Sequence, residues 1–123
     1  MAVAQYSALA LIAFLVSPIM VMVMVMANSY EVDWSTEIAS SGFAHENTFF
    51  AGDVLNFHYD KNYHNVVVAT DSDAFEQCNM EPNLGFYTNG NEALTLVEAG
   101  YYYFMCEYNC ESDGMKMSMY VYN

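Results

Sequence analysis

Two cysteines and a methionine lie close together in the last quarter of the chain. Cys106, Cys110 and Met115 occupy a short polar segment between two apolar runs that are typical of β-strands. These runs cover residues 101–105 and 117–121. Thiolate and thioether sulfur atoms are ligands that soft metals such as Cu(I) prefer. The residue types therefore predict a soft-metal site, or the remains of one, on a strand-to-strand loop, with one imidazole supplied from upstream.

The third cysteine, Cys78, raises the question of pairing. An odd number of cysteines in a secreted chain predicts one disulfide and one leftover thiol. By sequence distance alone, Cys110 can pair with Cys78 or with Cys106, and the second pairing would exclude a metal. We expect the leftover thiol to be buried, coordinated or used, because an exposed thiol is a liability in an oxidising compartment.

The first 27 residues contain no charged side chain and are mostly apolar from residue 8 onward. Small residues follow at 27–29, which favours cleavage by signal peptidase. We therefore predict a signal peptide over residues 1–29 and a single domain over 30–123, secreted to the extracellular space. The alternative is an uncleaved segment that tethers the domain to a membrane, because about 20 apolar residues can span a bilayer.

The remaining chain is strongly acidic. It carries all 15 acidic residues and only two basic ones, Lys61 and Lys116, for a formal net charge of −13. This balance excludes nucleic acid and anionic membranes as partners, since both require basic patches. It is compatible with a basic extracellular partner, and equally with an acidic surface that only keeps a monomer soluble. The last strand pattern ends at the final residue, so we expect no GPI-type anchor signal.

Short alternating or β-branched runs recur every ten to fifteen residues, separated by turn residues. In 54–59, apolar and polar side chains alternate strictly, which predicts a half-buried strand, and the β-branched run 66–68 predicts a buried one. Further strands are expected at 31–34, 93–97, 101–106 and 116–122. Asp71 is a good N-cap for a short helix over 71–77, whereas 35–48 and 79–91 are predicted as loops. This pattern predicts an all-β sandwich.

With these elements placed, the chain resembles a phytocyanin, and within that family the short plantacyanin type. The resemblance is carried by five segments in family order, which together span nearly the whole predicted domain. They are FAGDVLNFHY at 50–59, HNVVV at 64–68, CN at 78–79, LTLVEAGYYYFMC at 94–106 and GMK at 114–116. It implies a cupredoxin-like Greek-key β-sandwich, here expected with one short helix. It also implies a Cys78–Cys110 disulfide, which we favour over the short bridge.

The resemblance further implies a type 1 copper site in which His64, Cys106 and Met115 are ligands. The family pattern places a second histidine immediately before the disulfide cysteine, where this chain has Asn109. Two residues separate Cys106 from Asn109 instead of four, and four separate Cys110 from Met115 instead of three. An amide oxygen is a poor substitute for imidazole nitrogen at copper. We therefore expect copper, the implied cofactor, to meet an incomplete ligand set.

Other residues that suggest metal or redox chemistry have simpler interpretations. His45 and His58 are expected to be ordinary surface histidines. Met117 and Met119 alternate with Val121 and are expected in the core rather than in a thioether ladder. Three consecutive tyrosines, 101–103, alternate between strand faces, so packing accounts for them without a redox relay. The acidic residues around the site loop could dock a basic partner: Glu107, Glu111 and Asp113.

The sequence therefore predicts a secreted, phytocyanin-like extracellular interaction module that is non-redox or copper-impaired, in the manner of early nodulin-like relatives of the apoplast. The alternative is a small type 1 copper protein that transfers electrons. We expect no enzyme activity, because the sequence shows no nucleophile–base pair, phosphate loop or recognisably spaced carboxylate pair.

Overall fold

The computed structural model describes residues 17–21 and 26–123. Most of the predicted leader falls outside the described residues, so its cleavage remains a prediction. None of the helices in the described part is both long and apolar enough to span a membrane.

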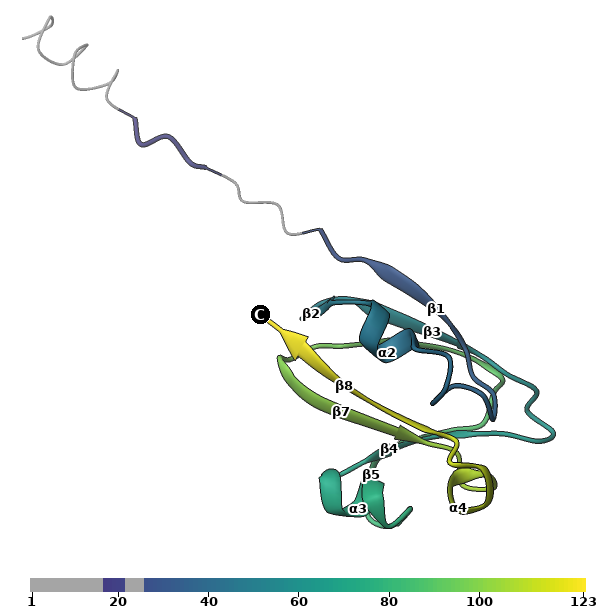
Figure 1. Cartoon of the computed structure of the whole chain (residues 1–123). Coiled ribbons are helices and arrows are strands. Elements are labelled where there is room, and N and C mark those ends of the chain that lie inside the picture. The colour runs from purple at the N-terminus through teal and green to yellow at the C-terminus, as the bar shows by residue number, and fades with distance from the viewer. Residues whose placement is uncertain (1–16, 22–25) are drawn as a thin grey trace, which may run out of the picture.

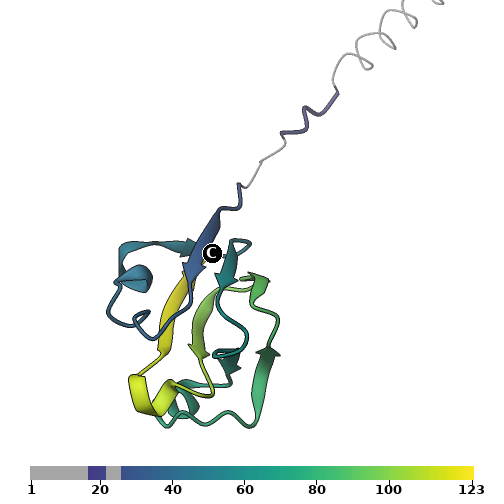
Figure 2. The ribbon, with the colours of Figure 1, turned by 90° about the vertical axis from the view of Figure 1, so that its right-hand side faces the viewer.

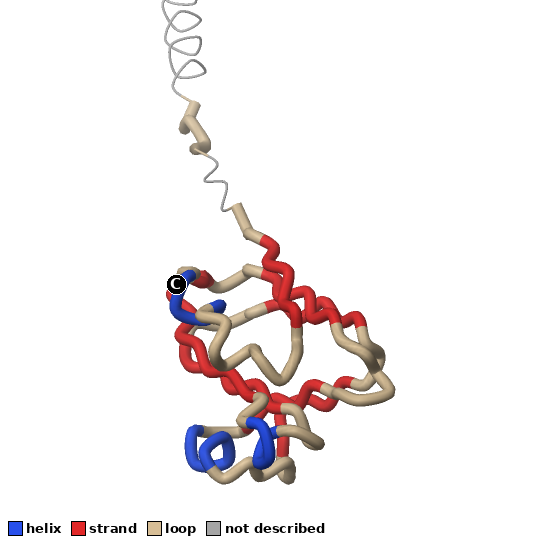
Figure 3. Tube along the Cα trace, turned by 45° about the vertical axis from the view of Figure 1, so that its right-hand side comes forward, coloured by secondary structure: helices blue, strands red, loops and turns tan. Residues whose placement is uncertain are grey.

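Two β-sheets pack face to face (Figures 1 and 3). The smaller sheet has the order β1-β3-β6, formed by Ser29–Asp33, Val54–His58 and Asn91–Thr95. The larger sheet has the order β2-β8-β7-β4-β5. Its strands are Phe49–Phe50, Lys116–Tyr122, Gly100–Met105, Val66–Ala69 and Asn83–Tyr87. The β1–β3 and β2–β8 pairs are parallel and the others antiparallel. The strand order places β1 at an edge of the smaller sheet.

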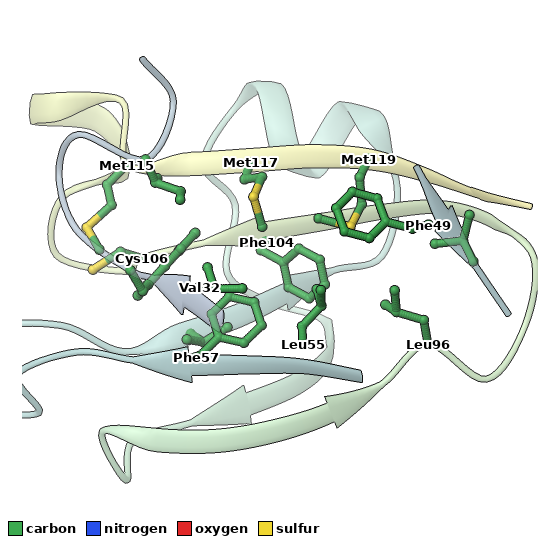
Figure 4. Close-up of a cluster of buried hydrophobic side chains, with 14 residues drawn as sticks. Val32, Phe49, Leu55, Phe57, Leu96, Phe104, Cys106, Met115, Met117 and Met119 are labelled. Carbon is green, nitrogen blue, oxygen red and sulfur yellow. The ribbon is translucent and has the colours of Figure 1, made fainter. Parts of the chain in front are cut away.

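The core lies between the sheets and follows from their alternating sequences. In β8 every second residue is buried, which places Met117, Met119 and Val121 inward and confirms that these methionines are core residues. Figure 4 shows them facing side chains of the smaller sheet. The rings of Phe57 and Phe104 meet across the interface with centroids 5.2 Å apart. Burial of such apolar surface stabilises the sandwich and holds its two ends in place.

A buried carboxylate joins the N-terminal strand to the turn between β2 and β3. Asp53 accepts hydrogen bonds from the backbone N–H groups of Asn28 and Phe50, both at 2.9 Å. These bonds compensate for its removal from water. The turn also needs Gly52, whose φ of +99° is a conformation that other residues rarely adopt.

Three short helices lie in the described part of the chain, where one was predicted: α2 (Phe43–Glu46), α3 (Ser72–Glu76) and α4 (Cys110–Asp113). Helix α3 is the predicted one, and the Asp71 carboxylate caps it by accepting from the Ala74 N–H at 2.8 Å. The other two are single turns, too short to show a helical period in sequence. Figure 2 shows α4 at the opposite end of the sandwich from the C-terminus.

Two predicted loops are wrong in part. Residues 35–48 include α2, and 79–91 include β5, which pairs with β4 at the edge of the larger sheet. The asparagine, glycine and proline content of 79–91 disguises this strand. A Cβ added at Gly85 would lie 2.7 Å from the Tyr87 ring, so a larger residue there would require that ring to move. The strand predicted at 93–97 begins and ends two residues earlier, as β6.

Candidate metal centre

The candidate site lies at the α3–α4 end of the sandwich, where the loop before β4 meets the loop between β7 and β8. The structure brings together His64, Cys106 and Asn109. The His64 Nδ1 atom lies 3.7 Å from the Cys106 Sγ atom and 3.0 Å from the Asn109 Oδ1 atom. The Asn109 Oδ1 atom is also 3.7 Å from the Cys106 Sγ atom. The side chain at position 109 therefore reaches the predicted ligands despite the shortened loop.

Met115 joins this cluster from the end of the same loop. Its side chain is fully buried, packs in the same core cluster as Cys106, and reaches toward it in Figure 4. The backbone places the two residues side by side, since the Cys106 N–H donates to the Met115 carbonyl at 3.0 Å. A thiol and a thioether thus lie on the buried side of the site, and an imidazole lies on its half-exposed side.

The loop between these residues is closed by backbone hydrogen bonds. The Cys110 N–H donates to the Cys106 carbonyl at 2.9 Å, and the Met115 N–H donates to the Asn109 carbonyl at 3.1 Å. Between them, α4 ends at Gly114, whose φ of +62° provides the left-handed C-cap. This compact turn places Asn109 between Cys106 and Met115 along the loop.

A carboxylate sets the orientation of the Asn109 amide. The Asn109 Nδ2 group donates to an Asp113 carboxylate oxygen at 2.9 Å, and the Ser112 hydroxyl donates to the same oxygen at 2.8 Å. These donors, Asn109 foremost, hold the pKa of Asp113 below its usual range. Because the amide nitrogen faces Asp113, the amide oxygen must face His64 and Cys106.

A second asparagine holds the two ligand loops together. Asn65 is buried, and its Oδ1 atom accepts from the Glu107 N–H at 2.9 Å. Its backbone carbonyl accepts from the Trp34 Nε1 group, also at 2.9 Å. Because Asn65 follows His64 and Glu107 follows Cys106, this bond sets the separation of the two predicted ligands. This role was not predicted from the sequence, although a polar residue at the start of a buried run was the available signal.

The cysteines pair as the resemblance implied. Cys78 and Cys110 form a disulfide with Cα atoms 5.8 Å apart, and Cys106 is free and buried. The alternative Cys106–Cys110 bridge is therefore wrong. The disulfide joins the segment after α3 to the start of α4 and leaves one thiol facing the site.

The remaining histidines lie at exposed positions, on α2 for His45 and on β3 for His58, which pairs with Glu31. Within residues 17–21 and 26–123, no three side chains among His, Cys, Asp and Glu gather in a way that could hold a metal ion. The donors available to copper are thus one imidazole, one thiol and one thioether, beside an amide oxygen. This donor set suits Cu(I), which accepts sulfur ligands, better than it suits a type 1 centre, which requires two imidazoles.

Comparison with known proteins places these features in a family. The plastocyanin-like domain family matches residues 34–115. The basic blue protein of Cucumis sativus is 38% identical over 73 residues, covering 58% of this chain and 73% of that protein. Uclacyanin-2 of Arabidopsis thaliana is 29% identical over 99 residues, covering 78% of this chain but only 48% of that protein. The chain therefore spans about half the length of this second relative.

Solved structures agree with this placement. Spinach plantacyanin superposes with a TM-score of 0.63 at 32% identity, covering 74% of this chain and 96% of that chain. The sandwich described above is thus the cupredoxin fold, as expected from the sequence. The matched region contains every predicted ligand and both disulfide cysteines.

Proposed function

We propose, since this chain belongs to the phytocyanin family of plastocyanin-like domains, that it is a copper-impaired member which acts as an extracellular interaction module rather than as an electron carrier. One observation carries the proposal. The Asn109 amide oxygen, turned inward by Asp113, lies 3.0 Å from the His64 Nδ1 atom that faces the Cys106 thiol.

This contact determines which form of the imidazole is present. An amide oxygen only accepts hydrogen bonds, so His64 must carry its proton on Nδ1 and donate it to Asn109. A metal needs the lone pair of that same nitrogen, and the ring must then move its proton to the other nitrogen. Asn109 therefore removes one imidazole from the ligand set and occupies the metal-facing nitrogen of the other.

Copper, if bound, would be held by His64, Cys106 and Met115, and would supply one-electron chemistry there. With one imidazole and two sulfur donors, these residues favour the reduced ion over a reversible couple. Cys106 and Met115 are also fully buried in an apolar cluster. They therefore contribute to packing whether or not a metal binds.

The proposed interaction role draws on the charge around the site. Glu107, Glu111 and Asp113 are exposed on the ligand loop and its helix, in a chain of net charge −13. Such a rim favours a basic partner through electrostatic attraction. We include in the proposal that residues 1–29 are removed and that the domain is extracellular, with membrane tethering through an uncleaved leader as the alternative.

The test is a titration of the purified protein with Cu(II), followed by visible absorption and by thiol labelling of Cys106. We expect no intense copper–thiolate band and full labelling of the thiol after mild unfolding. Cys106→Ala is the matched control, because it removes the thiolate and retains the disulfide. An intense band that disappears reversibly on reduction would overturn the proposal.

The alternative function is a type 1 copper electron carrier. It is favoured by a specific observation, that three of the predicted ligands converge and that Asn65 still connects their loops. A band in the wild-type protein that Cys106→Ala abolishes, with reversible reduction, would establish this function in place of the first.

A further inference from the structure

A continuous row of aromatic side chains covers the outer surface of the larger sheet. We define the aromatic face as Phe50, Tyr101, Tyr103, Tyr120 and Tyr122, which lie on the outer side of β2, β7 and β8. Four of them are exposed, and Tyr103 is half-buried against α3. Tyr101 is 69% exposed and Tyr122 is 50% exposed. Contiguous exposed aromatic side chains are typical of an interaction site.

The rings form an unbroken chain of contacts. Centroid distances are 6.1 Å from Phe50 to Tyr122, 4.9 Å from Tyr122 to Tyr120, 4.8 Å from Tyr120 to Tyr101 and 6.2 Å from Tyr101 to Tyr103. The chain continues to Phe75 of α3, 5.2 Å from Tyr103. Rings that brace one another lose little conformational freedom when a ligand binds, so the face is preorganised.

The tyrosine hydroxyls distinguish this face from the core. The Tyr102 hydroxyl, on the inner face of β7, donates to the Glu98 carbonyl at 2.8 Å, and the half-buried Tyr59 hydroxyl donates to Glu92 at 2.9 Å. By contrast, within the described residues none of the four phenol hydroxyls of the aromatic face has a protein hydrogen-bond partner. They remain available to a polar ligand.

The face is also free of negative charge in an otherwise acidic chain. The remaining residues on the outer side of β7 and β8 are Met105, which is buried in a second cluster with Ala74 of α3, and Lys116 and Ser118. No carboxylate therefore lies on the outer side of β2, β7 or β8. The Lys116 ammonium, the one cationic side chain on these three strands, lies 4.7 Å from the Phe75 centroid and donates to the Phe75 carbonyl. The outer side of these strands therefore has no carboxylate and one cation that is already engaged, and it presents free tyrosine hydroxyl groups.

We infer that the aromatic face binds a neutral polysaccharide. The C–H groups on the face of a pyranose ring are attracted to the negative face of an aromatic ring, and sugar hydroxyls can bond the phenol groups. Acidic polymers are disfavoured by the net charge of −13. The same charge opposes the docking of a second copy. This inference is independent of copper, because the aromatic face contains none of the predicted ligands.

The test uses the purified full chain and two neutral probes, insoluble cellulose in a co-sedimentation assay and soluble hydroxyethyl cellulose in affinity gels. Polygalacturonate is the anionic comparison. We expect retention by at least one neutral polymer, weakened about tenfold by Tyr101→Ala or by Tyr120→Ala and lost in the double variant. Tyr63→Ala is the matched control, since this tyrosine is 68% exposed but lies at the copper-site end.

Thermal unfolding checks that each variant is folded. If one single variant does not fold, the other single variant alone tests the inference. The inference is overturned if no neutral polymer retains the protein, if all variants bind equally, or if polygalacturonate binds instead. It is also overturned if sedimentation shows a dimer that Tyr120→Ala dissociates, because the face would then belong to a second copy.

Discussion

Two asparagines at the same end of the sandwich have opposite effects on the candidate metal centre. Asn65 connects the loops that carry His64 and Cys106 by accepting from the Glu107 N–H. Asn109 places an amide oxygen between those same two residues and accepts from His64. The first holds the loops of the two predicted ligands together, whereas the second engages the His64 nitrogen that faces the Cys106 thiol.

The comparison shows that the change is local. The supporting frame, formed by Asn65, Trp34 and the Cys78–Cys110 disulfide, is complete. The side chain at 109, its hydrogen bonds and the spacing of the loop around it differ from the pattern that the resemblance implies for a type 1 centre. Residues around a metal site orient its ligands and are needed nearly as much as the ligands themselves. In a chain that keeps the frame and alters one ligand, substitutions in the frame should therefore change the free energy of unfolding, and substitutions at the ligand position should change the copper affinity.

The largest effect is expected from removing the disulfide. The double variant Cys78→Ala/Cys110→Ala should lose about 3–4 kcal/mol of unfolding free energy, because the bridge closes a loop with a sequence separation of 32 residues. Denaturant unfolding would measure this. Cys106→Ala is the comparison, and it should cost only about 1 kcal/mol for the small void it leaves. Equal losses would contradict the division into frame and ligand.

The next effect concerns the frame asparagine. Asn65→Ala should cost about 2 kcal/mol of unfolding free energy, because it leaves the Glu107 N–H without its partner in a part-buried site. Asn62→Ala, at an exposed loop position three residues earlier, is the matched control and should stay within about 0.5 kcal/mol of wild type. If the two variants unfold alike, Asn65 does not hold the loops.

Restoring the missing imidazole tests the other half of the comparison. Asn109→His should raise Cu(II) affinity by about tenfold and produce a copper–thiolate band, because the side chain at 109 already reaches His64 and Cys106. Asn109→Ala is its control, since it removes the amide oxygen without adding nitrogen. No gain in the histidine variant would show that the shortened loop, rather than ligand identity, is the main defect.

A feature could be predicted from the sequence when it depends on residues that are close together in the chain. Strict alternation in 54–59 and 116–122 predicted β3 and β8, and the resemblance supplied the disulfide. Strand β5 was missed because its pairing with β4, rather than its own composition, makes it a strand. The role of Asn65 was missed for the same reason, because it depends on the approach of two loops that the tertiary fold sets: Asn65 and Glu107 are 42 positions apart. Asp113 lies only four positions from Asn109, and its role was missed because the short helix α4 was not predicted.

The smallest effect is electrostatic and tests the orientation of Asn109. The pKa of Asp113 is held below the ordinary carboxyl value of 3.8, first by Asn109 and then by Ser112. Because this pKa is lowered in the folded state, the contribution of Asp113 to stability is present above the ordinary value and is lost as the pH falls through the folded-state pKa. We expect Asn109→Ala to raise the pKa of Asp113 toward 3.8, measured by NMR titration of its carboxyl carbon, and Ser112→Ala to raise it less. An unchanged titration in Asn109→Ala would mean that the amide nitrogen does not face Asp113. The amide oxygen would then not be held against the metal-facing nitrogen of His64.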